Sequence, residues 1–165
     1  MRLGIDIREL ARGRATGIGR FVRDFIRYAS QARPDHRFFL YGNQHTVLPG
    51  EWPNVEARIV PERLTLWWDQ RVLPNLARAD RLDVLFSPYI KGPVCCPCSL
   101  VVTIHDLTLT LYPGKKMTSL LYRRAYDLTI KSAIRNAKKI IAVSWNTKKD
   151  LEKILKADST KIQVI

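Results

Sequence analysis

Five short apolar runs, set among helical patterns, constrain the fold of this chain more than any other feature. The runs are Arg2–Ile7, Arg37–Tyr41, Asp83–Phe86, Leu100–Ile104 and Lys139–Val143. Several are continuously apolar, without alternating polar residues, which indicates strands that are buried on both faces. Strands of this kind in alternation with helices predict an α/β fold, a Rossmann-like parallel sheet with helices on both faces.

Weaker patterns complete the order of elements. Val55–Val60 and Lys161–Ile165 are interpreted as further strands. Helices are expected over about residues 18–29, 64–79, 117–137 and 145–155, and Pro74 is expected to kink or split the second of them. The 165 residues suit a single domain, residues 1–165. Because the last expected strand reaches the final residue, we expect this domain to be part of a longer protein.

The chain is strongly basic, with 28 Lys and Arg residues against 15 Asp and Glu residues and a formal net charge of +13. Such a surface attracts phosphate groups on nucleic acid, on anionic lipid or on a small molecule. The basic residues are spread along the chain, so they predict the charge of a partner and not its identity. The sequence shows neither a signal-peptide core nor a membrane-spanning run. We therefore expect a cytoplasmic protein that can rest on a membrane surface.

Three cysteines, Cys95, Cys96 and Cys98, lie together in one segment. Cys95 and Cys98 have the C-x-x-C spacing of redox and zinc sites. A tetrahedral zinc site needs four ligands, and no second Cys or His pair lies nearby in the sequence. Redox pairs normally open a helix, whereas this segment precedes an expected strand. These points favour a structural loop over a redox or metal site.

A segment with two glycines, Thr16–Arg20, lies between the first expected strand and the first expected helix. Gly17 and Gly19 would let backbone N–H groups approach a phosphate at the helix N-terminus, and Arg14 and Arg20 would add charged contacts. The segment lacks the third glycine of a dinucleotide-binding loop and the Gly-Lys-Ser/Thr of a P-loop. Taken alone, it fits a turn that begins a helix better than a phosphate site.

Polar residues follow two of the buried strands. His105 and Asp106 come after Leu100–Ile104, and Ser144 comes after Lys139–Val143. Ligands bind beyond the carboxyl ends of strands in such sheets, so we expect these residues to share one rim. His105 and Asp106 could bind sugar hydroxyls or act as acid and base; alternatively, Asp106 caps a helix. For Ser144 a helix cap is favoured over contact with a ligand.

Two further patterns have both a structural and a functional interpretation. The pair Trp67 and Trp68 is expected to place at least one tryptophan in the core, in preference to a platform that stacks on a sugar. A group of basic residues in the second half of the chain fits a solvated face, or alternatively a face toward anionic lipid. They are Arg123, Arg124, Lys131, Arg135, Lys138 and Lys139.

Taken in order, these motifs resemble the N-terminal domain of family 4 (group 1) glycosyltransferases, particularly the mannosyltransferase-like members. The resemblance covers essentially the whole chain. It rests on Gly4–Asp6, Thr16–Arg20, Trp68–Gln70 with Leu73–Pro74, Asp83–Pro88, Val102–Thr108, Ile141–Ser144 with Thr147–Leu151, and Lys161–Ile165. Leu109 stands where members often have proline, which leaves the geometry of that loop open.

The resemblance implies one half of a GT-B fold, in which two Rossmann-like domains face each other across a cleft. It implies retaining transfer from a nucleotide sugar, with no cofactor and no essential metal. The N-terminal domain would shape the acceptor site. Gly17 and Gly19 would lie near a diphosphate, while His105, Asp106 and Ser144 would line the cleft. The donor-binding C-terminal domain is absent from these 165 residues.

The leading hypothesis is therefore an acceptor-binding domain of an enzyme that moves a sugar to a lipid-linked or polysaccharide acceptor. The fragment alone is expected to be inactive. The alternative is a non-catalytic basic module that binds nucleic acid or a membrane surface. Nucleic acid is not expected, because the sequence carries no motif for it. A half that pairs with a separate donor-domain chain is a third possibility.

Overall fold

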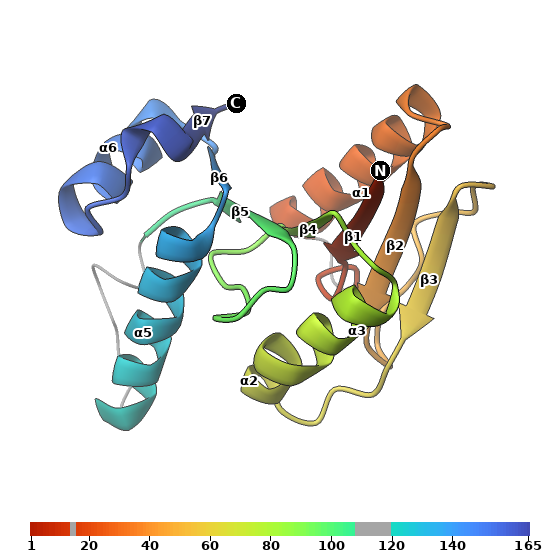
Figure 1. Ribbon diagram of the computed structural model, residues 1–165, viewed down its shortest axis with the longest axis horizontal. Coiled ribbons are helices and arrows are strands. Elements are labelled where there is room, and N and C mark those ends of the chain that lie inside the picture. The colour runs from red at the N-terminus through yellow and green to blue at the C-terminus, as the bar shows by residue number, and fades with distance from the viewer. Residues whose placement is uncertain (14–15, 108–119) are drawn as a thin grey trace.

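The computed structural model describes residues 1–13, 16–107 and 120–165. Within them, seven strands form one parallel sheet in the order β3-β2-β1-β4-β5-β6-β7 (Figure 1). The strands are β1 (Arg2–Asp6), β2 (Arg37–Gly42), β3 (Val55–Ile59), β4 (Val84–Ser87), β5 (Ser99–Ile104), β6 (Lys139–Ala142) and β7 (Ile162–Val164). This confirms the predicted Rossmann-like sheet, and each predicted strand agrees with the structure to within one residue at either end.

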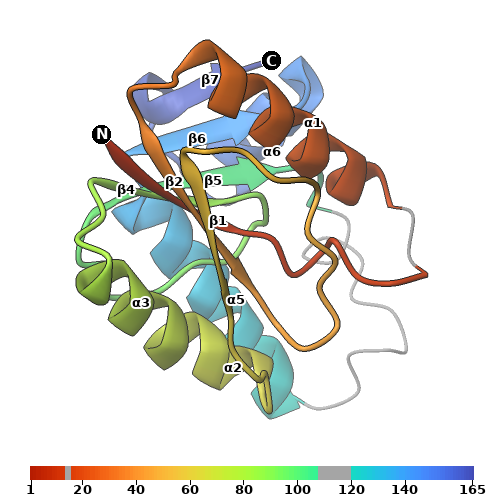
Figure 2. The same cartoon turned by 90° about the vertical axis from the view of Figure 1, so that its right-hand side faces the viewer.

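Helices cover both faces of the sheet, as Figures 1 and 2 show. One core cluster joins α1 to β1, β2 and β4, and the other joins α3, α5 and α6 to the opposite side. The described helices are α1 (Gly17–Ala32), α2 (Thr65–Trp67), the π-helix η1 (Trp68–Val72), α3 (Leu73–Ala79), α5 (Leu120–Asn136), α6 (Trp145–Ile154) and the 3-10 turn η2 (Ser159–Lys161).

The helix α1 packs through the apolar stripe that the sequence predicts. Val22 and Ile26 are fully buried against Ile5 and Ile7 of the first strand and its end. Arginines and other polar residues fill the opposite, exposed face of α1. This packing fixes the N-terminus of α1, at Gly17, relative to the carboxyl end of β1.

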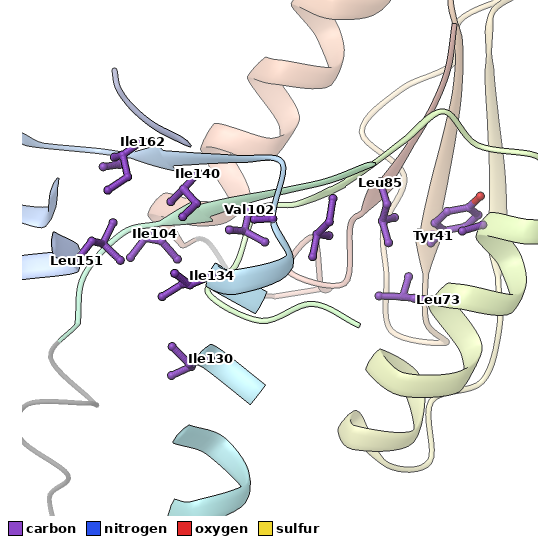
Figure 3. Close-up of a cluster of buried hydrophobic side chains, with 14 of the residues drawn as sticks. Tyr41, Leu73, Leu85, Val102, Ile104, Ile130, Ile134, Ile140, Leu151 and Ile162 are labelled. Atoms are coloured by element: carbon purple, nitrogen blue, oxygen red, sulfur yellow. The ribbon is translucent and has the colours of Figure 1, made fainter. Parts of the chain in front are cut away.

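The larger core cluster lies on the other face of the sheet (Figure 3). Leu85, Val102 and Ile140 of three adjacent strands are buried in it together with Ile134 of α5 and Leu151 of α6. Full burial of such a side chain contributes about 1.5–3 kcal/mol. The packing therefore holds the carboxyl ends of β4, β5 and β6 in fixed relative positions.

The segment expected as one helix over residues 64–79 consists of three joined pieces, α2, η1 and α3. The prediction that Pro74 kinks or splits the helix is confirmed, because the segment divides immediately before Pro74, between η1 and α3. Pro74 lies in the first turn of α3, where a missing N–H costs little, and the irregular turn is η1, which precedes it. Trp68 is fully buried while Trp67 is 59% exposed, which confirms that one tryptophan belongs to the core.

The C-terminal half follows the predicted order. The long helix α5 begins at Leu120 in the described part, and residues 117–119 of the expected helix lie outside it. Of the described helices, none has the length and apolar character needed to cross a membrane.

Candidate functional site

The carboxyl ends of four adjacent strands bring four loops to one edge of the sheet. β1 leads into Ile7–Glu9, β4 into Pro88–Tyr89, β5 into His105–Asp106, and β6 into Val143–Trp145. Because β1, β4, β5 and β6 are neighbours in the parallel sheet, their ends lie side by side. We refer to these four segments as the rim.

His105 is fixed at the rim by three contacts. Its Nε2 lies 3.0 Å from the carbonyl oxygen of Pro88. Its ring meets the ring of Phe21 edge-to-face, with centroids 6.0 Å apart, and its own carbonyl accepts a hydrogen bond from the Thr147 hydroxyl at 3.3 Å. Because a carbonyl only accepts, Nε2 donates to Pro88, and Nδ1 is then the acceptor of the neutral ring.

Asp106 follows His105 on the rim and is exposed. The predicted helix cap by Asp106 and the departure at Leu109 both concern residues 108–119, which lie outside the described residues.

Ser144 begins α6 as its N-cap. Its Oγ accepts a hydrogen bond from the N–H of Thr147 at 3.0 Å, which confirms the cap interpretation. The next residue, Trp145, is 69% exposed, and the ammonium group of Lys148 lies 5.7 Å from its ring centroid. Sequence reasoning missed Trp145, although its position directly after a strand-end serine was the available signal.

The glycine segment has a clear structural role. Thr16 caps α1 by accepting a hydrogen bond from the Gly19 N–H at 2.9 Å, so that N–H already has an acceptor. A β-carbon on Gly19 would come within 3.2 Å of the Thr16 hydroxyl and 3.5 Å of the Glu9 carbonyl, whereas one on Gly17 would meet nothing within 4 Å. Gly17 and Arg20 are exposed at the helix start. They are the part of the predicted phosphate site that stays open to a ligand; Arg14 lies outside the described residues.

A buried ionic cluster, which the sequence reasoning did not find, is centred on Arg8 of the rim. The Arg8 guanidinium is 2.7 Å from Asp6, 2.6 Å from Asp69 and 2.9 Å from Glu62. It also lies over the Trp68 ring, 5.0 Å from the ring centroid. Glu62 and Asp69 lie 54 and 61 residues from Arg8 in the sequence, so no local pattern could reveal the cluster. We refer to Asp6, Arg8, Glu62 and Asp69 as the Arg8 cluster.

Burial and charge compete within the Arg8 cluster. Burial lowers the pKa of Arg8, but the carboxylates, Asp6 foremost, raise it above its ordinary value. Burial raises the pKa of Asp69 from 3.8 to about 6, against the attraction of Arg8 and with added repulsion from Asp6. For Glu62, burial is outweighed by a hydrogen bond from Asn43 and by Arg8, so its pKa is lowered. The cluster ties β1 to η1 through one guanidinium.

Tyr89, in the loop after β4, contacts the loop after β1. Its hydroxyl accepts a hydrogen bond from the N–H of Glu9 at 2.7 Å, and burial raises its pKa well above the ordinary value. The preceding residue, Pro88, supplies the carbonyl that holds His105. The loop after β4 thus links the loop after β1 to the imidazole after β5.

A pocket of about 620 Å³ lies between the loops that follow β1 and β2. Apolar side chains, among them Leu10, Val47 and Leu48, line it together with Arg12 and Arg23. An apolar wall with two guanidinium groups suits an amphipathic ligand that bears phosphate. Among the residues that the structure describes, no group of three or more His, Cys, Asp or Glu side chains is placed to hold a metal ion.

The comparisons with known proteins agree with this fold. A family model described as Glycosyltransferase Family 4 matches residues 15–165. WaaG, a glycosyltransferase involved in lipopolysaccharide biosynthesis, superposes with a TM-score of 0.67 at 16% identity, covering 100% of this chain and 44% of WaaG. The apo form of WaaB, a lipopolysaccharide outer core galactosyltransferase, gives 0.62 at 9% identity, covering 99% of this chain and 45% of WaaB.

A third solved structure, the H548A form of the wall teichoic acid polymerase TagF, gives a TM-score of 0.59 at 10% identity, covering 98% of this chain and 37% of TagF. These likenesses show the fold alone, and the chain spans less than half the length of each of the three proteins. No curated protein sequence matches the chain.

Proposed function

The chain belongs to glycosyltransferase family 4, and on that premise we propose that it is the acceptor-side domain of a retaining glycosyltransferase. The complete enzyme would move a sugar, for example mannose, from a nucleotide sugar to a lipid-linked or polysaccharide acceptor. The family match over residues 15–165 carries this proposal, since the matched segment includes His105, Asp106 and Ser144 of the rim.

His105 is proposed to bind the reacting sugar or acceptor through Nδ1. With Nε2 committed to the Pro88 carbonyl at 3.0 Å, Nδ1 of the neutral ring can accept a hydrogen bond from a sugar hydroxyl or take its proton. Asp106, exposed beside it, adds a second acceptor for hydroxyl groups. The edge-to-face contact with Phe21 restrains the ring, which favours one orientation of the bound sugar.

Trp145 is proposed to stack on a sugar ring of the acceptor. A tryptophan that is 69% exposed buries little of its apolar face in this domain, and the hydrophobic face of a pyranose can cover it. Trp145 lies next to Ser144, the N-cap of α6. Thr147 donates one hydrogen bond to Ser144 and another to the His105 carbonyl. Trp145 and His105 therefore lie at the ends of two adjacent strands, β6 and β5. Trp145, and neither Trp67 nor Trp68, is thus proposed as the platform that stacks on a sugar.

A phosphate or diphosphate of the acceptor is proposed to bind near the start of α1. Gly17 is open, Arg20 is exposed, and the first helical turn directs N–H groups outward. The nearby pocket adds Arg12 and Arg23 to an apolar wall, which suits the lipid end of a lipid-linked acceptor. The similar structures include a glycosyltransferase involved in lipopolysaccharide biosynthesis and a wall teichoic acid polymerase, which favours acceptors of this class.

No cofactor or essential metal is proposed for the reaction, and the nucleotide sugar would bind mainly to a second domain. The chain covers 44% of WaaG, so the isolated 165 residues are expected to bind acceptor without transferring sugar. We also propose a cytoplasmic location at an anionic membrane surface, with no nucleic acid partner. The net charge of +13 and the exposed Leu64, Leu66 and Trp67 support the membrane contact.

Tryptophan fluorescence offers a direct test of the proposed acceptor site. The ligand is a water-soluble, short-chain prenyl-diphosphate sugar, and the same prenyl diphosphate without sugar is the control. Addition of the sugar compound is expected to quench fluorescence in the Trp67→Phe variant, in which Trp145 remains. The Trp145→Phe variant is expected to lose that quenching, and His105→Ala is expected to weaken binding.

Equal quenching in the Trp145→Phe and Trp67→Phe variants would show that the sugar does not approach the rim. Binding of the prenyl diphosphate as tightly as the sugar compound would remove sugar recognition from the proposal. Sugar transfer by the purified 165-residue chain would contradict the assignment of donor binding to a second domain.

A further inference from the structure

Two cysteine side chains meet in the loop between β4 and β5, away from the rim. The Sγ atoms of Cys96 and Cys98 are 3.7 Å apart, with only Pro97 between the two residues. Both side chains are half-buried against the larger core cluster, whereas Cys95 is exposed. The structure therefore pairs Cys96 with Cys98, and not Cys95 with Cys98 as the C-x-x-C spacing suggested.

We propose that Cys96 and Cys98 form a reversibly oxidisable thiol pair, which closes to a disulfide under attack by a peroxide or a small disulfide such as oxidised glutathione. The proposal does not depend on the glycosyltransferase function. A disulfide requires an S–S distance of about 2.05 Å, so the sulfurs need a short approach along a contact that already exists. The pair is a modification site of this loop.

The roles of the two sulfurs follow from their surroundings. The hydrogen bond from Cys98 lowers the pKa of Cys96 to about 7, and Arg78 acts in the same direction. The same contact and burial raise the pKa of Cys98. Cys96 is thus the thiolate that attacks, and Cys98 is the thiol that resolves the intermediate.

The steps balance with one peroxide molecule as the oxidant. The Cys96 thiolate attacks one peroxide oxygen, the O–O bond breaks, and Cys96 becomes a sulfenic acid as hydroxide leaves. The Cys98 sulfur then attacks the Cys96 sulfur; the S–S bond forms, the S–O bond breaks, and the Cys98 proton leaves with the oxygen as water. Hydrogen peroxide is reduced to water and the two thiols are oxidised to one disulfide.

The loop that holds the pair is anchored on both sides. Gln70 of η1 accepts a hydrogen bond from the Val94 N–H at 2.8 Å and donates one to the Gly92 carbonyl at 3.3 Å. Asn136 of α5 donates to the Val94 carbonyl at 2.8 Å, and the Ser99 N–H is bonded to the Asp83 carbonyl at 3.2 Å. These contacts bracket residues 95–98 and keep the two sulfurs adjacent. Metal capture is not favoured, because the described residues offer no third ligand beside the pair.

Thiol counting after oxidation of the purified chain tests the proposal. The reduced protein is treated with hydrogen peroxide or oxidised glutathione, alkylated with N-ethylmaleimide, and analysed by intact and peptide mass. Two of the three thiols are expected to escape alkylation in a monomer lighter by two hydrogens, with an internal Cys96–Cys98 link that dithiothreitol reverses. Cys95→Ser is expected to form the same link, while Cys96→Ser and Cys98→Ser form none.

Results of three kinds would overturn the proposal. All three thiols could still be alkylated after the wild-type chain is treated with oxidant. Alternatively, the disulfide could involve Cys95, or it could join two molecules. Circular dichroism of each serine variant shows whether it is folded. The peptide map of the wild-type chain and of Cys95→Ser decides the pairing even if another variant unfolds.

Discussion

Asp69→Asn should change the pH dependence of stability in a direction that the Arg8 cluster determines. The Asp69 side chain is 4% exposed, and burial raises its pKa from 3.8 to about 6. Folding therefore favours the protonated form. The stability that this form contributes is fully present below about pH 4 and is lost as the pH rises through about 6.

The magnitude follows from the same rise in pKa. At about 1.4 kcal/mol per pKa unit, wild type should lose about 2–3 kcal/mol of unfolding free energy through Asp69 between about pH 4 and pH 7. The amide of Asp69→Asn does not titrate, and its oxygen can still accept from Arg8. The unfolding free energy of the variant minus that of wild type should therefore rise by about 2–3 kcal/mol over this interval. Glu62, whose lowered pKa acts in the opposite sense, is present in both proteins and cancels in the difference.

Urea unfolding followed by tryptophan fluorescence, repeated between pH 4 and pH 8, measures this difference. Asp24→Asn, on the exposed face of α1, is the matched control for the loss of one carboxylate and should show no comparable trend. A difference between Asp69→Asn and wild type that stays constant with pH, or falls as the pH rises, would refute the reasoning.

Further predictions concern the cluster, the α6 cap, the thiol pair and the membrane surface. Arg8→Met leaves three carboxylates without their cation and should cost about 3–5 kcal/mol in urea unfolding; a loss below about 1 kcal/mol would contradict the ionic role. Ser144→Ala should cost about 1 kcal/mol through the lost cap, and no loss would contradict the cap. Iodoacetamide labelling of Cys96 should have its pH midpoint near 7, and a midpoint near 9 would contradict the contact with Cys98. Trp67→Ser should weaken sedimentation with phosphatidylglycerol vesicles, and equal binding of both proteins would remove the proposed anchor.

The sheet could be predicted because each strand carries its own signal. Continuous apolar runs such as Leu100–Ile104 need burial on both faces wherever they lie, and the strand ends then place His105 and Ser144 on one rim by topology alone. The Thr16 and Ser144 caps are also local, since each bonds an N–H three residues on. These parts of the structure depend on short stretches of chain.

The parts that escaped prediction depend on tertiary structure or on the shape of a loop, which residue patterns do not reveal. Arg8 meets Asp69 across 61 residues, and the π-helical turn η1, in which Asp69 lies, has no signature in the local sequence. Spacing suggested Cys95 with Cys98, but the shape of the loop pairs Cys96 with Cys98 at 3.7 Å. The exposure of Trp145 was missed although the start of its helix beside Ser144 was predicted.

Hydrogen exchange measured by mass spectrometry, with and without the short-chain prenyl-diphosphate sugar, tests the central claim most directly. The account predicts slower exchange in peptides that cover residues 7–13, 16–21, 88–91, 105–107 and 143–148, the loops at the carboxyl ends of β1, β4, β5 and β6 and the start of α1. The prenyl diphosphate without sugar should protect the α1 start but not His105 or Trp145. Protection confined to the opposite edge of the sheet, or protection of the rim by both compounds alike, would contradict a sugar-acceptor site on this rim.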